Sequence, residues 1–428
     1  MPFTISVELH FEIHSSFPHS AFSPFVISYP NMTSFTDELS HRLAQAREQN
    51  LFRELRRVDS AQGSRIHIAG REFLNFSAND YLGLATHPAL KSAAAEAVEK
   101  YGAGAGASRL ISGSLEPFHE LETALARFKK TESALGFATG YAAATGTIPA
   151  LMGKDDIIIL DKLVHASIVD GARLSGAKLR IFAHNDPADL EEKLQWAAKQ
   201  MATAKDGPIH TLVITESVFS MDGDLAPLSE IVTLKEKYGA WLMVDEAHAT
   251  GVIGKSGRGL ADELGVGDRI EIQMGTLGKA LGASGGYICG ARALIDYLVN
   301  RARSFIFSTA PVPAAAAAAA AAIKLLDSPE GFARRRTLWE LSAALNDRLR
   351  LSPAPLSSAI IPIILGDESR TLAAAEALRA KGIYIPAIRY PTVARGQARL
   401  RVTLTAAHST DDITTLANEL ALFLTQKS

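Results

Sequence analysis

Seven short, largely apolar runs recur between residues 134 and 289, and most of them are continuous rather than alternating. Such runs are typical of strands buried on both faces, as in a parallel sheet covered by helices. Amphipathic segments such as Leu190–Met201 and Leu228–Tyr238 lie between them and predict helices. The predicted strands are Ala134–Phe137, Ile157–Leu160, Leu179–Phe182, Thr211–Thr215, Trp241–Val244, Ile272–Met274 and Gly286–Cys289. This order predicts an α/β fold with a mainly parallel sheet.

The chain before this region has a different pattern. Residues 35–57 have helical spacing, and a predicted strand pair follows, Ile66–Ile68 and Glu72–Phe76, split by the turn residues Ala69-Gly70. Residues 1–31 contain no Lys or Arg, which argues against a signal or transit peptide. We expect a disordered extension there, or a true start of translation at Met32.

The chain after the predicted sheet begins with an alanine-rich stretch, residues 310–323. Alanine is the best helix former, and Pro313 suits a first helical turn, so this stretch predicts a helix. A long helix at 331–351, a strand at 359–365 and a helix at 369–381 follow. They predict a smaller α+β domain. The predicted parts are an extension (1–33), an N-terminal segment (34–85), a large domain (86–320) and a small C-terminal domain (321–428).

Composition narrows the possible partners. The 44 basic and 46 acidic side chains give a net charge of −2, which offers no electrostatic case for binding nucleic acid or an anionic membrane. No run approaches the roughly 20 apolar residues that span a bilayer. Cys289 is the single cysteine, so no internal disulfide can form. We therefore expect a protein of the cytoplasm, a reducing compartment.

Polar residues at the ends of the predicted strands are the candidates for chemistry, because ligands of parallel sheets bind beyond the carboxyl ends of strands. Asp245 ends a buried apolar strand, where a carboxylate is costly unless it meets a cation or hydrogen-bond donors. His248 follows three residues later. A protonated pyridine nitrogen would supply the cation. A metal site is the alternative, and we find no third ligand at supporting spacing.

Lys279 follows another predicted strand and has small or apolar neighbours, Gly278 and Ala280 among them. A desolvated lysine is a better amine nucleophile, whereas a solvated lysine in a flexible glycine loop is the alternative. Thr276 could bind a phosphate. Gly140 and Tyr141 follow a third strand and open a helix, whose N–H groups also suit a phosphate, although an ordinary tight turn would look the same.

Five ordered motifs resemble those of the α-oxoamine synthases. These are pyridoxal-phosphate (PLP) enzymes that join an amino acid to an acyl thioester and release carbon dioxide. The likeness runs from about residue 34 to the C-terminus. It rests on Asn79–Leu84, Ser108–Gly113, His165–Ser167, Asp245–His248 and Thr276–Lys279. The resemblance implies PLP-dependent transferase fold type I, with a large, mainly parallel domain and a smaller α+β C-terminal domain.

The resemblance also implies the residues around the cofactor ring. Lys279 carries the cofactor, Asp245 pairs with the pyridinium nitrogen, and His165 stacks on the ring; these three are the predicted catalytic residues. His248 and Ser220 contact the side of the ring that bears the phenolic oxygen.

Further residues are implied for the cofactor phosphate. Gly140, Tyr141 and Thr276 hold it within one subunit. Ser308 and Thr309 reach the phosphate of the neighbouring subunit. The resemblance therefore predicts a homodimer with shared active sites.

The resemblance also implies four substrate contacts. Arg401 binds the amino-acid carboxylate, Arg53 and Thr392 contact the acyl substrate, and Asn79 is a further substrate contact. Segments such as Ala183–Asp186 resemble the branch of the family that condenses L-alanine with a pimeloyl thioester in biotin synthesis. The carrier of the thioester, coenzyme A or acyl-carrier protein, stays open.

Three alternative functions remain open. The same machinery could condense glycine with acetyl-CoA, or use a long-chain acyl donor. A non-catalytic partner subunit is a second reading, although both Lys279 and Asp245 are present. A plain aminotransferase is a third, and the C-terminal segment fits it poorly.

Overall fold

The computed structural model describes residues 34–202, 207–351 and 357–424, so the predictions for residues 1–33 lie outside the described residues. The chain divides into two units, residues 1–52 and 53–428. The described part of the first unit holds helix α1 (Phe35–Glu48), which Ser34 caps by accepting a hydrogen bond from the Asp37 N–H at 3.1 Å. The helical prediction for 35–57 is wrong beyond Glu48, because Asn50 turns the backbone to a φ of 57°.

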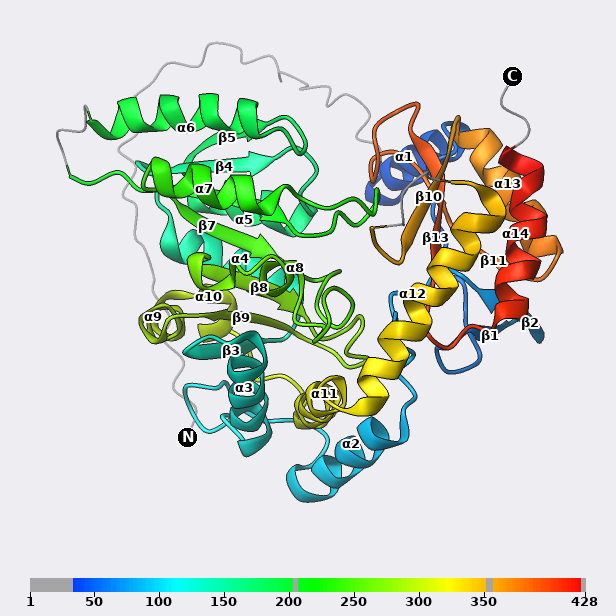
Figure 1. Cartoon of the computed structure of the whole chain (residues 1–428), viewed down its shortest axis with the longest axis horizontal. Helices are drawn as coiled ribbons and strands as arrows, with labels where there is room; N and C mark the ends of the chain where they lie inside the picture. Colours follow the sequence, from blue (N-terminus) through cyan, green and yellow to red (C-terminus); the bar gives the residue numbers. More distant parts are fainter. Residues whose placement is uncertain (1–33, 203–206, 352–356, 425–428) are drawn as a thin grey trace, which may run out of the picture. The chain divides into compact units, whose positions relative to one another are not determined.

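The second unit is built around a seven-stranded sheet in the order β3-β9-β8-β7-β6-β4-β5 (Figure 1). Neighbouring strands from β8 through β5 pair in parallel, and β9 runs antiparallel to both β8 and β3. All seven predicted strands are present. Their bounds are β3 (Ser133–Phe137), β4 (Ile157–Asp161), β5 (Lys178–Phe182), β6 (Thr211–Glu216), β7 (Trp241–Asp245), β8 (Ile272–Thr276) and β9 (Gly286–Gly290).

Most of the strands are continuously apolar because successive residues enter two different cores. The edge strand β5 is the exception, since it contains Lys178 and Arg180 and is largely exposed. Ile157 and Ile159 of β4 join one core, whereas Ile158 and Leu160 join the other. The first core includes residues of α3 (Glu116–Lys129), α6 (Pro187–Ala202) and α7 (Leu228–Lys237). The second includes residues of α4 (Gly140–Leu151), α5 (Ala166–Ser175), α9 (Arg292–Arg301) and α10 (Arg303–Ile306). Helices thus cover both faces of the sheet, which confirms the predicted fold class.

Two small sheets accompany the large one. β1 (Arg65–Ile68) and β2 (Arg71–Asn75) form the predicted hairpin, and β2 also pairs with β11 (Ile383–Tyr384). β13 (Ala398–Thr403) lies between β10 (Ile360–Gly366) and β12 (Ala387–Ile388). The remaining C-terminal helices are α13 (Glu368–Ala380) and α14 (Thr410–Leu424).

Two long helices connect the large sheet region to the C-terminal sheet. α11 (Pro313–Leu326) is the predicted alanine helix, and its small side chains pack against α2 (Pro88–Tyr101) and α3. α12 (Pro329–Leu349) then leads toward β10 and packs against α14 (Figure 1). The boundary predicted at residue 320 falls inside α11, and the domain limits stay predictions. The short helices α8 (Leu260–Glu263) and η1 (Gly267–Arg269) precede β8.

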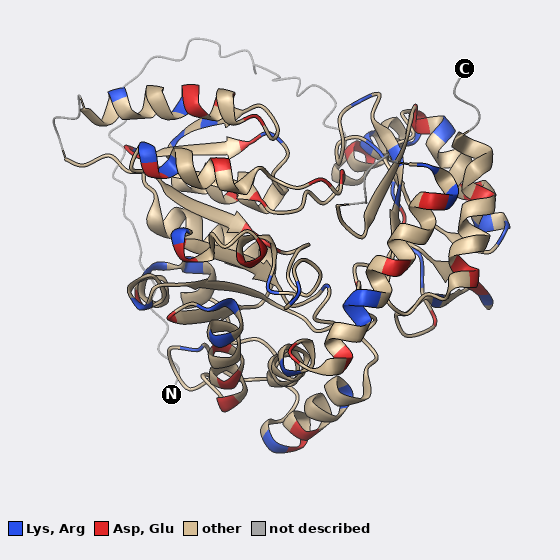
Figure 2. Ribbon diagram, viewed as in Figure 1, with Lys and Arg blue, Asp and Glu red and all other residues tan. Residues whose placement is uncertain are grey.

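Charged residues are distributed over most of these elements. Lys and Arg are interspersed with Asp and Glu, as along α12 (Figure 2). Among the described residues, no helix combines the length and apolar character that crossing a membrane requires.

Candidate active site

The parallel strands bring three residues, of which Asp245 and Thr276 were predicted, to the carboxyl end of the sheet. Glu216, Asp245 and Thr276 are the last residues of β6, β7 and β8. Glu216 lies beside Asp245 in the strand register. Lys279 follows directly in the turn between β8 and β9, which the Gly282 N–H closes by donating to the Lys279 carbonyl at 2.8 Å. The carboxyl ends of the strands are where an α/β sheet binds ligands.

A line of hydrogen bonds leads from the Lys279 amine across the site. Lys279 Nζ lies 2.7 Å from His248 Nε2, and His248 Nδ1 lies 2.6 Å from the Tyr81 hydroxyl. The Tyr81 hydroxyl lies 3.3 Å from Asn79 Oδ1, which also accepts from Arg401 Nη1 at 3.2 Å. The amine is thereby connected to the guanidinium that the sequence assigns to the substrate carboxylate.

Arg401 is held by neutral oxygens. It lies on β13 with 6% of its surface exposed, and its Nε donates to the Ser220 carbonyl at 2.6 Å. It also donates to the Asn79 amide oxygen. Within the ranges that the structure describes, Arg401 forms no ion pair with a carboxylate. A buried cation of this kind is stabilised by an anion that binds beside it.

Burial changes the protonation of the ionisable groups. It lowers the pKa of Lys279 to about 8, although Asp245 and Glu216 oppose this shift. Burial raises the pKa of Asp245, and it raises that of Glu216 well above its usual value, to which the Asp245 charge adds. Burial and the Lys279 charge lower the pKa of His248 well below normal. His248 is therefore a neutral ring between the amine and Tyr81.

The residues predicted to hold a phosphate form a second cluster. Gly140 and Tyr141 open α4, so their N–H groups precede the first intrahelical hydrogen bond. A Cβ placed on Gly140 would lie 3.7 Å from Thr276 Cβ, so the Thr276 side chain packs directly on the helix start. Thr276 Oγ1 donates to the Gly285 carbonyl at 2.9 Å, and Tyr141 donates to Asp170 Oδ2 at 2.7 Å.

Four other predicted residues lie outside the line of hydrogen bonds that begins at Lys279. Thr309 pairs with Ser108 in an isolated β-bridge, and Ser308 is beside it, outside the hydrogen-bond line of Lys279. Arg53 Nη2 donates to Thr392 Oγ1 at 3.1 Å, so the two predicted acyl contacts do meet, at an exposed position.

Two further predicted residues are placed by their local contacts. Ser220 contributes its carbonyl to Arg401, as described above. His165 is exposed, caps α5 through a bond to the Ser167 N–H, and donates its own N–H to Glu216.

Two residues of the site were missed in the sequence. Tyr81 connects His248 with Asn79, and burial raises its pKa to about 12, so it stays a hydroxyl. Glu216 anchors the backbone of His165. The sequence did hold a signal for each residue. Tyr81 lies two residues after the predicted substrate contact Asn79, and Glu216 directly follows a predicted strand.

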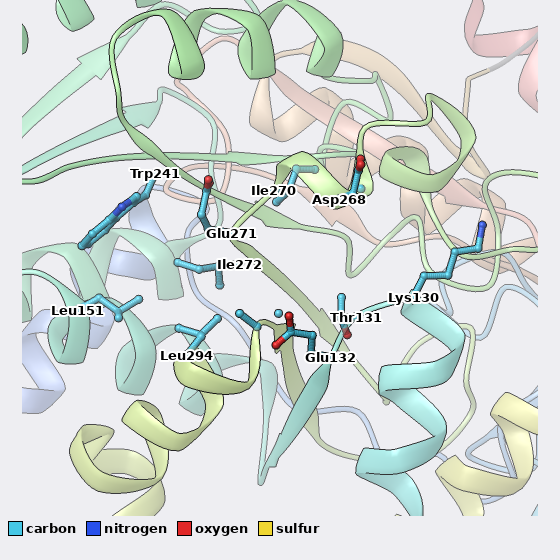
Figure 3. Close-up of a pocket in the computed structure, with 13 residues that line it drawn as sticks. Lys130, Thr131, Glu132, Leu151, Trp241, Asp268, Ile270, Glu271, Ile272 and Leu294 are labelled. Carbon is cyan, nitrogen blue, oxygen red and sulfur yellow. The ribbon is translucent and has the colours of Figure 1, made fainter.

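A cavity of about 510 Å³ lies elsewhere, at the amino ends of the parallel strands (Figure 3). Trp241 and Ile272 line it, and they are the first residues of β7 and β8. Asp245 ends β7 four residues later, about 13 Å along the strand. The cavity is therefore separate from the candidate active site.

The residues at the strand ends fit the implied PLP cofactor. The cluster offers a phosphate cradle at α4, a buried carboxylate in Asp245 and an amine of lowered pKa in Lys279. Gly140 lacks a side chain where the backbone must approach the phosphate. The part of the chain that the structure describes contains no group of three or more His, Cys, Asp or Glu able to hold a metal ion.

Comparisons with known proteins agree with this site. The aminotransferase class I and II family matches residues 71–420. The 8-amino-7-oxononanoate synthase of Geobacter sulfurreducens is 49% identical over 88% of this chain and 95% of its own, and that of Geotalea daltonii is 47% identical over 91% and 97%. A solved serine palmitoyltransferase from S. paucimobilis with bound PLP superposes with a TM-score of 0.83 at 29% identity, covering 91% of this chain and 97% of its own. The chain therefore belongs to the aminotransferase class I and II family and, within it, to the PLP-dependent α-oxoamine synthases.

Proposed function

We propose that this protein condenses L-alanine with a pimeloyl thioester and releases carbon dioxide and the free thiol, giving 8-amino-7-oxononanoate for biotin synthesis. The burial of Arg401, which forms no ion pair with a carboxylate of the described residues, carries the proposal, because such a guanidinium suits the carboxylate of an amino acid. The names and high identity of the relatives support the choice of product.

The cofactor would be held by residues that the structure already groups. Lys279 would bind it covalently, Asp245 would pair with the ring nitrogen, and the start of α4 with Thr276 would take the phosphate. When bound, PLP supplies an electron sink for bond breaking at the amino-acid Cα.

The protein residues then orient the substrate and move protons. Arg401, with Asn79 beside it, would fix the carboxylate. The Lys279 amine, with its pKa near 8, removes the Cα proton, and neutral His248 accepts a hydrogen bond from that amine. Cα then bonds to the thioester carbonyl carbon as the C–S bond breaks, and the thiolate takes up a proton from solvent. The original carboxylate leaves as carbon dioxide. Lys279 is placed to return a proton to Cα.

The acyl carrier, the assembly and the location are part of the proposal. Arg53 and Thr392 would contact the acyl substrate, carried by coenzyme A or acyl-carrier protein. A homodimer would bring Ser308 and Thr309 to the phosphate of the partner site. We place the protein in the cytoplasm, since its single cysteine, Cys289, is buried and suits a reducing compartment.

The fold comparison favours one second candidate, condensation of serine with a long-chain acyl thioester, because a serine palmitoyltransferase superposes closely. Thiol release by the PLP-loaded protein separates the two. Pimeloyl-CoA and palmitoyl-CoA would each be offered with L-alanine, glycine or L-serine. We expect release with pimeloyl-CoA and alanine, and a product of the mass of 8-amino-7-oxononanoate. Release only with serine and palmitoyl-CoA would overturn the proposal.

A further inference from the structure

His184 and Asn185 form a polar bridge that the proposed chemistry does not use. They lie between β5 and α6. His184 Nδ1 lies 2.9 Å from Asp161 Oδ1, and His184 Nε2 lies 2.8 Å from Asp224 Oδ2. The Asn185 N–H donates to Asp161 Oδ2 at 3.0 Å, and Asn185 Nδ2 donates to Asp224 Oδ2 at 2.9 Å. Two adjacent residues therefore make four hydrogen bonds to two carboxylates.

The geometry requires a protonated ring. A carboxylate accepts hydrogen bonds, so both ring nitrogens of His184 must donate, which only the imidazolium can do. Burial opposes this charge, but the hydrogen bonds to Asp161 and Asp224 prevail and raise the pKa of His184 to about 10. The ring also packs edge-on against Phe219, with the centroids 4.3 Å apart.

The local backbone holds the bridge in place. Asn185 has a φ of 53°, a conformation that asparagine tolerates better than most residues. Asp186 caps α6 by accepting from the Ala188 and Asp189 N–H groups at 3.0 and 3.1 Å. The Asp189 carboxylate in turn accepts from the Ala183 N–H at 2.7 Å. The first turn of α6 thus holds the backbone on both sides of His184, at Ala183 and at Asp186.

One carboxylate belongs to the segment that carries His165. Asp161 is the last residue of β4, and its Oδ1 also accepts from the Leu163 N–H at 2.8 Å. Two residues later the chain reaches His165, whose N–H is bound by Glu216. Asp161 therefore shapes the path from the strand end to the predicted stacking residue.

The other carboxylate belongs to the loop that holds Arg401. The Asp224 carbonyl accepts from the Phe219 N–H at 3.1 Å, which closes the loop after β6. In this loop the Ser220 carbonyl accepts from Arg401 Nε at 2.6 Å. The Met221 carbonyl and the Asp222 carboxylate bind Arg399, two residues earlier on β13. The position of Arg401 therefore depends on a loop anchored at Asp224.

We propose that His184 is a positioning residue that ties the segment bearing His165 to the loop whose Ser220 carbonyl orients Arg401. His184 is not proposed to touch the substrate or the cofactor. It acts through its hydrogen bonds to Asp161 and Asp224. The inference rests on the proposed function in one respect, namely that Arg401 binds the amino-acid carboxylate.

The test replaces His184 with glutamine, which is neutral and donates from one nitrogen only, so it cannot reproduce the two donor nitrogens of the ring. Amino-acid affinity would be measured without thioester, by absorbance titration of the PLP-loaded protein with L-alanine, glycine and L-serine. We expect the Kd of the preferred amino acid, and its KM, to rise about tenfold, because small displacements of positioning groups have effects of this size or larger. PLP occupancy should stay unchanged. His67→Gln is the matched control, since His67 is an exposed histidine that faces the single carboxylate of Glu72.

Asp224→Asn gives a second route to the same answer, should His184→Gln fold poorly. If His184 acts through Asp224, each single variant weakens amino-acid binding, and the double variant is no worse than either. Unchanged Kd and KM in both single variants, with only a lower Tm, would show a purely structural role and overturn the inference. Failure of the proposed function would show in the wild-type protein, as thiol release with another substrate pair, and the titration would still report on the bridge.

Discussion

Lys279 shows how burial prepares an amine for chemistry near neutral pH. Its pKa falls from 10.5 to about 8, because burial disfavours the ammonium more than Asp245 and Glu216 stabilise it. The neutral amine is the form that bonds to the aldehyde of PLP. Since the neutral fraction grows as pH rises, cofactor uptake by the apoenzyme should accelerate with pH and level off above about 8. Stopped-flow absorbance of apoenzyme mixed with PLP would measure this, and a midpoint near 10.5 would contradict it.

Replacing Lys279 with alanine should remove both the covalent link to PLP and the base for the Cα proton. We expect thiol release to fall at least about 10³-fold, within the range known for loss of a general base. Mass spectrometry after borohydride reduction would report the missing link. Lys237→Ala is the control, because Lys237 is an exposed lysine of α7 that pairs with Glu191 on α6. Near-normal turnover by the Lys279 variant would exclude the assigned role.

The site residues that could be predicted are those that can be recognised from their immediate neighbours in the sequence. Asp245, Thr276 and Lys279 follow apolar strands directly, and the parallel pairing of β7 and β8 places those strand ends side by side. Tyr81 and Glu216 were missed because their roles arise from tertiary contacts, with His248 and with the His165 backbone. The His184 bridge likewise joins segments that are far apart in the sequence.

At the scale of elements, continuous apolar runs predicted most strands of the large sheet, because burial on both faces selects apolar residues at successive positions. β5 was predicted as well, although Arg180 interrupts it and most of its residues are exposed. The two-residue strands β11 and β12 were not located, since two residues show no periodicity. Helical spacing alone overextended α1. Its end is set by the left-handed backbone of Asn50, which the hydrophobic pattern does not encode.

The start of α4 depends on a glycine in another element. A Cβ on Gly286, the first residue of β9, would lie 2.5 Å from the Thr139 carbonyl oxygen and 2.6 Å from Gly140 Cα. Gly286→Ala should therefore displace the helix start that is proposed to bind the phosphate. We expect about tenfold weaker PLP binding and a lower Tm, measured by titration and thermal unfolding of the apoenzyme. Gly104→Ala is the control, because nothing lies within 4 Å of its added Cβ. Equal PLP affinity in the two variants would refute the prediction.

The His184 bridge should also make stability depend on pH. The pKa of His184 is raised from 6.5 to about 10 by Asp161 and Asp224, so folding favours the protonated ring. Its contribution to stability is complete below pH 6.5 and is lost as pH rises through about 10. We expect the Tm difference between the wild-type protein and His184→Gln to shrink steadily over this interval. Thermal unfolding at half-unit pH steps would test it, and a constant or growing difference would show that the ring is neutral in the fold.

At the scale of the whole molecule, an apolar surface lies beside the residues predicted to serve a neighbouring subunit. Ile111 and Phe307 are 81% and 71% exposed, and Leu110 and Val312 are about half exposed. The bridge between Ser108 and Thr309 joins the two segments that carry them. Exposed apolar side chains gathered around one bridge are typical of an interaction surface. The adjacent Ser308 and Thr309 would then enter the partner site.

Introducing a charge on this surface should separate the subunits. We expect Phe307→Asp to convert the proposed dimer to a monomer, because pairing would bury an uncompensated carboxylate. Sedimentation velocity would give the mass, and PLP titration would give the affinity, which should fall together with dimerisation if Ser308 and Thr309 complete the phosphate site of the partner. Ile181→Asp is the control, since Ile181 is 59% exposed on β5, at the opposite edge of the sheet from β3.

A Phe307 variant that stays dimeric would place the interface elsewhere. A monomer with unchanged PLP affinity would keep the interface and remove Ser308 and Thr309 from the cofactor site.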